Sequence, residues 1–161
     1  VARFGARVAY TLDGGDVGEI ESESFSADAM TLSFHGFNTH PGYAKGRMVN
    51  AIKVAAEFIA SLPADGLSPE TTADREGFMH PYVMQAGVDR TSVRVLIRDF
   101  EDEGLREKEA LLERLARSVT MRHPGSTMEI TIEGTRHFVA ATVVPTPFFH
   151  PPRKTATPPL S

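Results

Sequence analysis

The chain has 161 residues, no cysteine, and a small excess of 21 Asp and Glu over 17 Lys and Arg. One domain is the default for this length, and the scattered charges exclude the basic stripe of a nucleic-acid surface. No apolar run approaches the roughly 20 residues that span a bilayer, and without cysteine neither disulfides nor thiolate zinc sites can form. We therefore expect a protein compatible with a cytoplasmic location that binds neither nucleic acid nor membrane.

Alternating apolar and polar side chains predict the first strands. Residues 7–12 form a short, mostly apolar run that Asp13 and two glycines end with a turn, and residues 19–25 predict a second strand. Residues 36–42 are expected to form a loop. A third strand is predicted before this loop, where apolar residues alternate with polar ones at Met30, Leu32 and Phe34.

From Lys45 the period changes to that of a helix. Pro63 should end this helix because proline cannot continue its hydrogen bonds, and the Asn50 amide is expected two turns into the helix. Residues 63–75 predict an exposed loop. The expected apolar face comprises Met48, Ile52, Ala55, Ile59 and Leu62.

The second half of the chain predicts a strand within residues 77–87, a further strand, a helix and a final strand. Asp99 and Asp102 can cap the start of the helix, where exposed amides favour an acid. The helix has an apolar stripe of Leu105, Leu112, Leu115 and Val119. The alternating residues of the two strands are Val93, Val95 and Ile97, then Met128, Ile130 and Ile132.

The resulting order of strand, helix, strand, strand, helix, strand predicts a split βαβ fold of the α+β class. This ferredoxin-like fold has a four-stranded antiparallel sheet with two helices on one face. An open edge of such a sheet can pair with a second copy, although edge pairing and a protected monomer both remain possible. Residues 137–161 hold six of the eleven prolines and predict a disordered tail, or the product of a frameshift near Gly134.

Four polar residues are candidates for chemistry, and each has a plainer alternative. Asp13 can ligate a catalytic zinc or simply form a turn. His40, before Pro-Gly, can stabilise the oxygen of a peptide carbonyl under attack or be a loop residue. Arg98 suits a substrate carboxylate, or an ion pair with a neighbouring acid. Asn50 can bind the same carboxylate or a nearby backbone group.

Several short blocks occur in an order and at spacings that point to one family. They are YTLDGG at 10–15, THPGYAKGRMVNA at 39–51, VDR at 88–90 and IRDF at 97–100, with LPAD at 62–65, EGF at 76–78 and HP at 123–124. These blocks resemble the tripeptide aminopeptidase (peptidase T) family of di-zinc exopeptidases. The resemblance implies that residues 1–19 end a catalytic zinc domain and that residues 20–136 form a lid and dimerisation domain.

The resemblance also implies a homodimeric enzyme with two zinc ions per active site, which releases the N-terminal residue of tripeptides. It makes Asp13 a zinc ligand and His40 a catalytic donor that reaches the partner subunit's active site. It makes Asn50 and Arg98 ligands of the short peptide's terminal carboxylate. The family's His-x-Asp motif and Glu-Glu pair do not occur in the chain, so we expect the chain alone to be inactive.

Two alternatives stay open at this stage. One is a stand-alone ferredoxin-like dimerisation or ligand-binding module without enzymatic activity, in which Asp13 and His40 are loop residues. The other is a related exopeptidase or deacylase, in which Arg98 and Asn50 serve a different carboxylate.

Overall fold

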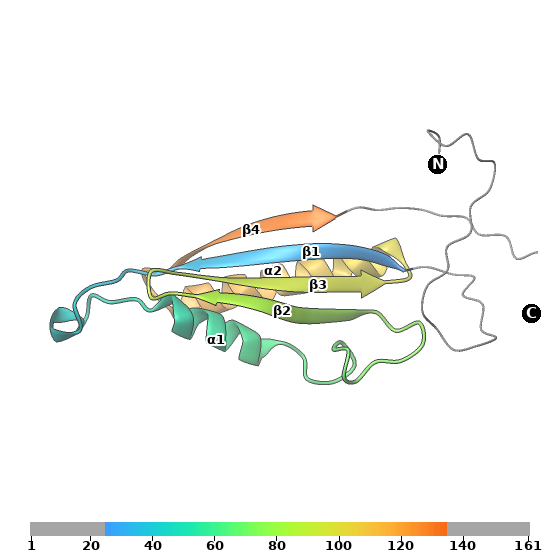
Figure 1. Ribbon diagram of the computed structural model, residues 1–161, viewed down its shortest axis with the longest axis horizontal. Helices are drawn as coiled ribbons and strands as arrows, with labels where there is room; N and C mark the ends of the chain where they lie inside the picture. The colour runs from blue at the N-terminus through green and yellow to red at the C-terminus, as the bar shows by residue number, and fades with distance from the viewer. Residues whose placement is uncertain (1–24, 135–161) are drawn as a thin grey trace, which may run out of the picture. The chain divides into compact units, whose positions relative to one another are not determined.

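The computed structural model describes residues 25–134, which form one sheet and two long helices (Figure 1). The elements in chain order are β1 (Ser26–His35), the short 3₁₀ helix η2 (Pro41–Tyr43), α1 (Ala51–Ser61), β2 (Phe78–Ala86), β3 (Arg90–Asp99), α2 (Asp102–Arg122) and β4 (Thr127–Gly134). This order confirms the predicted split βαβ arrangement.

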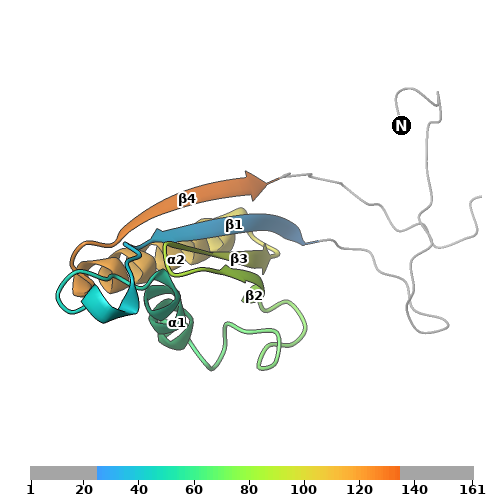
Figure 2. The same cartoon turned by 60° about the vertical axis from the view of Figure 1, so that its left-hand side comes forward.

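The sheet has the strand order β2-β3-β1-β4, and every neighbouring pair is antiparallel. In the central pair, Ser26 of β1 lies opposite Asp99 of β3, and His35 lies opposite Arg90. Both helices lie on one face of the sheet, as Figure 2 shows. No described element covers the other face, so the predicted two-layer α+β fold is confirmed.

The hydrophobic core lies between the sheet and the helices. Phe34 of β1 and Phe58 of α1 are fully buried, with ring centroids 5.4 Å apart. Burying one such side chain stabilises the fold by about 1.5–3 kcal/mol, so alternation along a strand fixes which face meets the helices. The strands and helices bury Met30, Leu32, Val93, Val95, Ile97, Val54, Ala55, Leu105, Leu112, Ala116 and Val119 around this pair.

The start of the first helix was wrongly predicted. α1 begins at Ala51 rather than at Lys45, and Asn50 is its N-cap residue rather than lying two turns inside. The reason is a backbone bridge between Phe37 and Val49, which holds the chain out of a helix until this point.

The buried face of α1 shifts accordingly. Ile52 is 37% exposed, and Met48 precedes the helix, so neither belongs to the buried face. The helix ends at Ser61, close to the proline expected to end it. The residues of α1 that are buried are Ala51, Val54, Ala55 and Phe58.

The second helix begins near its predicted start, with a different cap. Its N-cap residue Glu101 makes no side-chain bond to the helix, and Asp102 lies in the first turn, where an acid favours the helix dipole. Asp99 accepts a hydrogen bond from the Glu101 N–H at 2.9 Å. Ala116 takes a buried position, and Leu115 of the predicted stripe is only partly buried. The rest of that stripe is buried: Leu105, Leu112 and Val119.

Several predictions lie outside the described residues. They include Asp13, the strand at 7–12, most of the strand at 19–25, the domain boundaries at 1–19 and 20–136, and the tail at 137–161. Neither described helix combines the length and apolar character needed to cross a bilayer.

Candidate functional site

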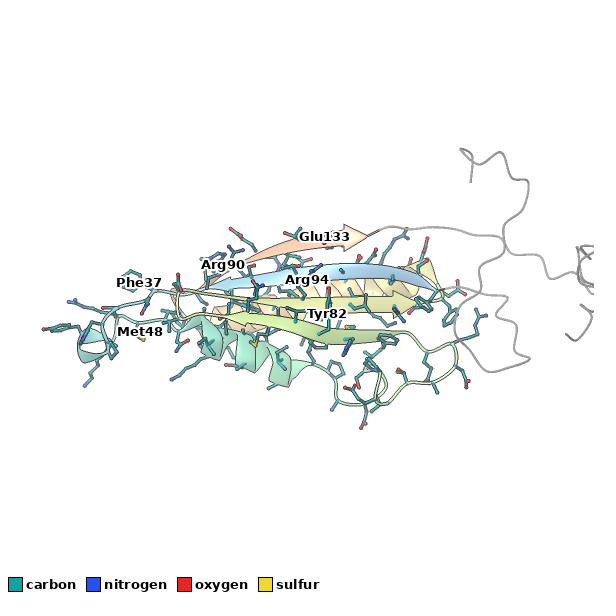
Figure 3. All side chains as sticks on the ribbon, in the orientation of Figure 1. Phe37, Met48, Tyr82, Arg90, Arg94 and Glu133 are labelled. Atoms are coloured by element: carbon teal, nitrogen blue, oxygen red, sulfur yellow. The ribbon has the colours of Figure 1, made fainter. Side chains whose placement is uncertain are left out.

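An arm of the chain, residues 36–50, projects from one end of the sheet between β1 and α1 (Figure 1). Phe37 and Val49 exchange backbone hydrogen bonds of 2.8 and 3.0 Å at its base. A Cβ on Gly36 would lie 2.1 Å from the Val49 carbonyl oxygen, so this close approach requires glycine. Figure 3 shows Phe37 and Met48 at the base. The arm is therefore anchored at its base, while its tip is exposed.

His40 lies at the tip of the arm as the N-cap of η2. Its Nδ1 accepts a hydrogen bond from the Gly42 N–H at 3.1 Å, and its ring lies 5.9 Å from that of Tyr43. A neutral imidazole whose Nδ1 accepts must carry its proton on Nε2. The Nε2–H is therefore the available donor, which is the form that can stabilise a developing oxyanion.

Asn50 lies where the arm meets α1. Its Oδ1 accepts a hydrogen bond from the Ile52 N–H at 2.9 Å, the usual geometry of an asparagine N-cap. The oxygen thus stabilises the helix start, while the side-chain NH₂ makes no hydrogen bond within residues 25–134. Those N–H groups can donate to an anion. The structure places His40 and Asn50 at the same end of the sheet.

Arg98 lies at the opposite end, near the end of β3 and across from Ala27 of β1. Its guanidinium carbon lies 4.2 Å from the ring centroid of Phe25 and 5.7 Å from that of Phe78. Such contacts attract the cation to the ring faces and fix the plane of the guanidinium. The planar fork of Arg98 is therefore held by aromatic side chains.

No acid within the described residues forms an ion pair with Arg98. The alternative interpretation, an ion pair between Arg98 and a neighbouring acid, is therefore not what the structure shows. The two nearest acids in sequence pair elsewhere: Asp99 with Lys108, and Glu101 with Arg75 at 3.7 Å. The Nε of Arg98 is buried and has no hydrogen-bond partner among residues 25–134. Arg98 is half-buried, and a partly buried cation without an acidic partner nearby is a candidate ligand for a carboxylate from elsewhere.

The proposed carboxylate ligands Asn50 and Arg98 are not brought together within one chain. Ala27 and His35 lie at opposite ends of β1, roughly 26 Å apart at about 3.3 Å per residue. The first lies across from Arg98, and the second directly precedes the arm. Any site that uses both Asn50 and Arg98 must therefore take them from different copies.

An ionic cluster that sequence reasoning missed joins the two helices. Glu57 of α1 accepts a hydrogen bond from Arg122 Nε at 2.7 Å, and its other oxygen lies 2.6 Å from His123 Nε2. Hydrogen bonds from Arg122 and then from His123 hold the pKa of Glu57 below its ordinary value. The partners are 65 and 66 residues apart in the chain, so no local pattern reveals them.

A second missed ion pair lies at the Arg98 end. Lys108 Nζ lies 2.5 Å from Asp99 Oδ2, and the two side chains are only 11 and 12% exposed. Burial raises the pKa of Asp99, but the bonds from Lys108 and the Glu101 N–H outweigh it, and the pKa is lowered. The sequence offered only an acid before a helix, a pattern that predicts a cap rather than an ion pair.

Two ionisable side chains on the open face of the sheet, Arg94 and His35, lie close to acids of β4. Arg94 lies over the Tyr82 ring at 5.6 Å and pairs with Glu133 at 3.3 Å, and Figure 3 labels all three residues. His35 lies 3.5 Å from Glu129 on the same face. Arg94 on this face therefore has an acidic partner of its own, unlike Arg98.

The two edges of the sheet differ. β2 contains Pro81 and a register shift between Pro81 and Val83, features that hinder pairing with another strand. β4 contains no proline and pairs with β1 without a register shift. Ile132 on β4 is 48% exposed. Of the two described edges, β4 is therefore the better suited to further pairing.

A groove with an apolar floor and charges of both signs on its helix side runs between β4 and α2. This mixture is typical of protein interfaces rather than of nucleic-acid surfaces. The groove is lined by Met30, Met128, Ile130, Ile132, Arg106, Glu109, Ala110, Glu113 and Arg117.

The described residues do not fit a zinc site. Nowhere in residues 25–134 do three His, Asp or Glu side chains converge as metal ligands would. The predicted ligand Asp13 lies outside this part of the chain.

The described residues thus combine a ferredoxin-like sheet, an anchored arm and a regular edge strand, an architecture that hosts many functions and does not by itself fix one. The sequence profile of the peptidase dimerisation domain family matches residues 22–146, and the chain belongs to this family. This finding confirms the predicted resemblance.

Among curated proteins, peptidase T of Vibrio parahaemolyticus serotype O3:K6 is 42% identical over 147 residues, which cover 91% of this chain and 36% of that protein. The chain thus spans about a third of the length of the curated relatives it matches.

Solved structures share the fold. The aminopeptidase PepT of Bacillus cereus ATCC 10987 superposes with a TM-score of 0.66 at 23% identity, over 83% of this chain and 36% of the other. The YXEP protein of Bacillus subtilis, described as a dinuclear metal binding peptidase of the M20 family, has a TM-score of 0.50 at 15% identity, over 71% of this chain and 28% of its own. At these identities the likeness concerns the fold alone.

Proposed function

We propose that the chain is the lid and dimerisation part of a zinc-dependent, cytoplasmic tripeptide aminopeptidase, which hydrolyses the N-terminal residue from tripeptides. Its family and its 42% identity to a protein named peptidase T support this function. The same relatives weigh against a stand-alone module without enzymatic activity. The zinc ions belong to the catalytic part, with Asp13 as one ligand, and the chain alone is expected to be inactive. The dinuclear metal peptidase of similar fold supports the use of metal.

The proposed active form is a homodimer joined through β4. Two copies of this strand, antiparallel across a twofold axis, extend the sheet from one subunit into the other. The choice of edge rests on the regular pairing of β4 and on the proline and register shift in β2. Ile132 and the adjoining groove would then be covered by the partner.

The observation that carries this proposal is the separation of the site residues along the sheet. Within a subunit, the arm and Arg98 lie at opposite ends of the central strands. Twofold pairing reverses the strand direction between subunits, so the arm of one subunit lies at the end where the partner presents Arg98. Each active site would then combine Arg98 of one subunit with His40 and Asn50 of the other.

The three residues have distinct proposed tasks. Arg98 and the side-chain NH₂ of Asn50 hold the terminal carboxylate of the peptide through charge-assisted hydrogen bonds. His40 donates its Nε2–H to the carbonyl oxygen as water attacks and negative charge develops there. The tautomer set by the Gly42 N–H supports this task for His40.

Subunit mixing tests the proposal in the complete enzyme. His40→Ala and Arg98→Ala are each expected to abolish most activity. In an equal mixture of the two variants, half of the dimers carry one of each chain, and one site in each such dimer has both residues intact. Activity should recover to about a quarter of the wild-type value.

The matched control mixes His40→Ala with Asn50→Ala. Both residues belong to the same arm, so every site in this mixture lacks one of them and no recovery is expected. If the first mixture also stays inactive, His40 and Arg98 act from the same chain, and the proposed assembly is wrong.

A further inference from the structure

The turn that joins α2 to β4 has no part in the proposed function, although its His-Pro dipeptide is among the blocks that mark the family. This turn begins at His123, the C-cap of α2, and its Gly125 has a φ of 89°. A Cβ on Gly125 would lie 3.2 Å from Cγ2 of Val49. The turn therefore packs closely against the base of the arm.

The same turn is tied to α1 through Glu57. One carboxylate oxygen of Glu57 lies 2.6 Å from His123 Nε2, and the other lies 2.7 Å from Arg122 Nε. Arg122 is itself fixed by a 2.8 Å hydrogen bond to Ser118 Oγ. Backbone and side-chain bonds of 3.0 and 2.7 Å from Ser126 to the His123 carbonyl oxygen hold the turn closed.

We propose that Glu57, Arg122 and His123 form a helix clamp that positions the arm. The clamp holds α1, whose start is capped by Asn50, against the turn that packs on Val49. Its members are positioning residues, because none of them contacts His40 or Asn50 directly. The consequence for catalysis rests on the proposed function, whereas the clamp itself can be tested without it.

Amide hydrogen exchange in the 161-residue chain tests the clamp. Glu57→Gln keeps the shape of the side chain and removes its charge. Exchange at the Phe37 and Val49 amides, which close the arm, should accelerate by roughly two- to fivefold, while the central amides of β1 and β3 keep their rates. The matched control is Glu103→Gln, which breaks an exposed ion pair with Arg106 on α2 and should leave the arm unchanged.

Unchanged arm exchange, or equal acceleration throughout the sheet, would overturn the proposal. If Glu57→Gln does not fold, the same exchange measurement is made on His123→Gln, with the same expected result. None of these outcomes depends on whether subunit mixing restores activity, so the two proposals fail separately.

Discussion

The two ends of the sheet hold their candidate site residues in different ways. At the arm end, main-chain hydrogen bonds and a helix cap hold His40 and Asn50 in place. At the other end, contacts between side chains hold the residues in place: aromatic rings flank Arg98, and a nearly buried ion pair joins Asp99 to Lys108. Substitutions should therefore cost more folding stability at the Arg98 end than at the exposed arm.

This difference fits what each end is proposed to do. An arm that serves another subunit must present its residues beyond its own core, so it depends on backbone geometry. A guanidinium that is to bind a carboxylate of the substrate must not be paired within its own subunit. Aromatic rings therefore hold its plane, and the neighbouring acids pair with other cations.

The largest loss of stability is expected for Lys108→Met. It leaves the Asp99 carboxylate nearly buried and without its cation, a change that destabilises a fold by about 3–5 kcal/mol. Urea unfolding at pH 7 measures the loss. Glu103→Gln, which breaks an exposed pair on the same helix, should cost less than about 1 kcal/mol. Equal losses in the two variants would mean that the buried pair is no more important than a surface pair.

The pH dependence of the folding stability gives a further test of the Asp99–Lys108 ion pair. Because the folded-state pKa of Asp99 is lowered, its contribution to stability is complete above the unfolded-state pKa of about 3.9 and is lost as the pH falls through the folded value. In Lys108→Met only the bonds from backbone N–H groups would oppose the effect of burial. The stability gap between wild type and variant should therefore narrow as the pH falls below about 4.

The fold could be predicted from the sequence because its central strands have one buried face and one open face. Alternation at Met30, Leu32 and Phe34 fixes both the strand and the direction of its side chains. The start of α1 was missed because the apolar spacing from Met48 onward imitates a helix. The N-cap preference of Asn50 was the available signal for the true start.

An intermediate loss of folding stability is expected for Gly36→Ala at the base of the arm. The new Cβ would approach the Val49 carbonyl oxygen to 2.1 Å, so the bridge would have to open, at about 2–3 kcal/mol. The complete enzyme should also lose activity, because His40 and Asn50 would no longer be presented correctly. Thermal unfolding and tripeptide turnover measure the two effects.

The control for this change is Gly66→Ala. Gly66 has a φ of 75° and no atom within 4 Å of a Cβ placed there, so only backbone strain of about 1–2 kcal/mol is expected. Turnover should stay normal. If Gly36→Ala kept full turnover, the bridge at the base of the arm would not be needed to position His40 and Asn50.

The candidate site was only partly predictable. His40, Asn50 and Arg98 were identified from residue types and family blocks, but their distribution over two ends depends on sheet register, which the sequence leaves undetermined. The Glu57 cluster joins residues far apart in the chain and exists only once α1 and α2 lie side by side.

The smallest change in stability, and the sharpest test of the arm end, comes from three variants of Asn50. Asn50→Ala removes the helix cap and should cost about 1 kcal/mol. Asn50→Asp and Asn50→Ser keep a capping oxygen and should fold almost as well as wild type. Only Asn50→Asp places a negative charge where the peptide carboxylate is proposed to bind, so it should raise KM for tripeptides by about tenfold or more through like-charge repulsion. If Asn50→Asp and Asn50→Ser had the same KM, Asn50 would act only as a helix cap. The peptide carboxylate would then be bound by Arg98 without Asn50.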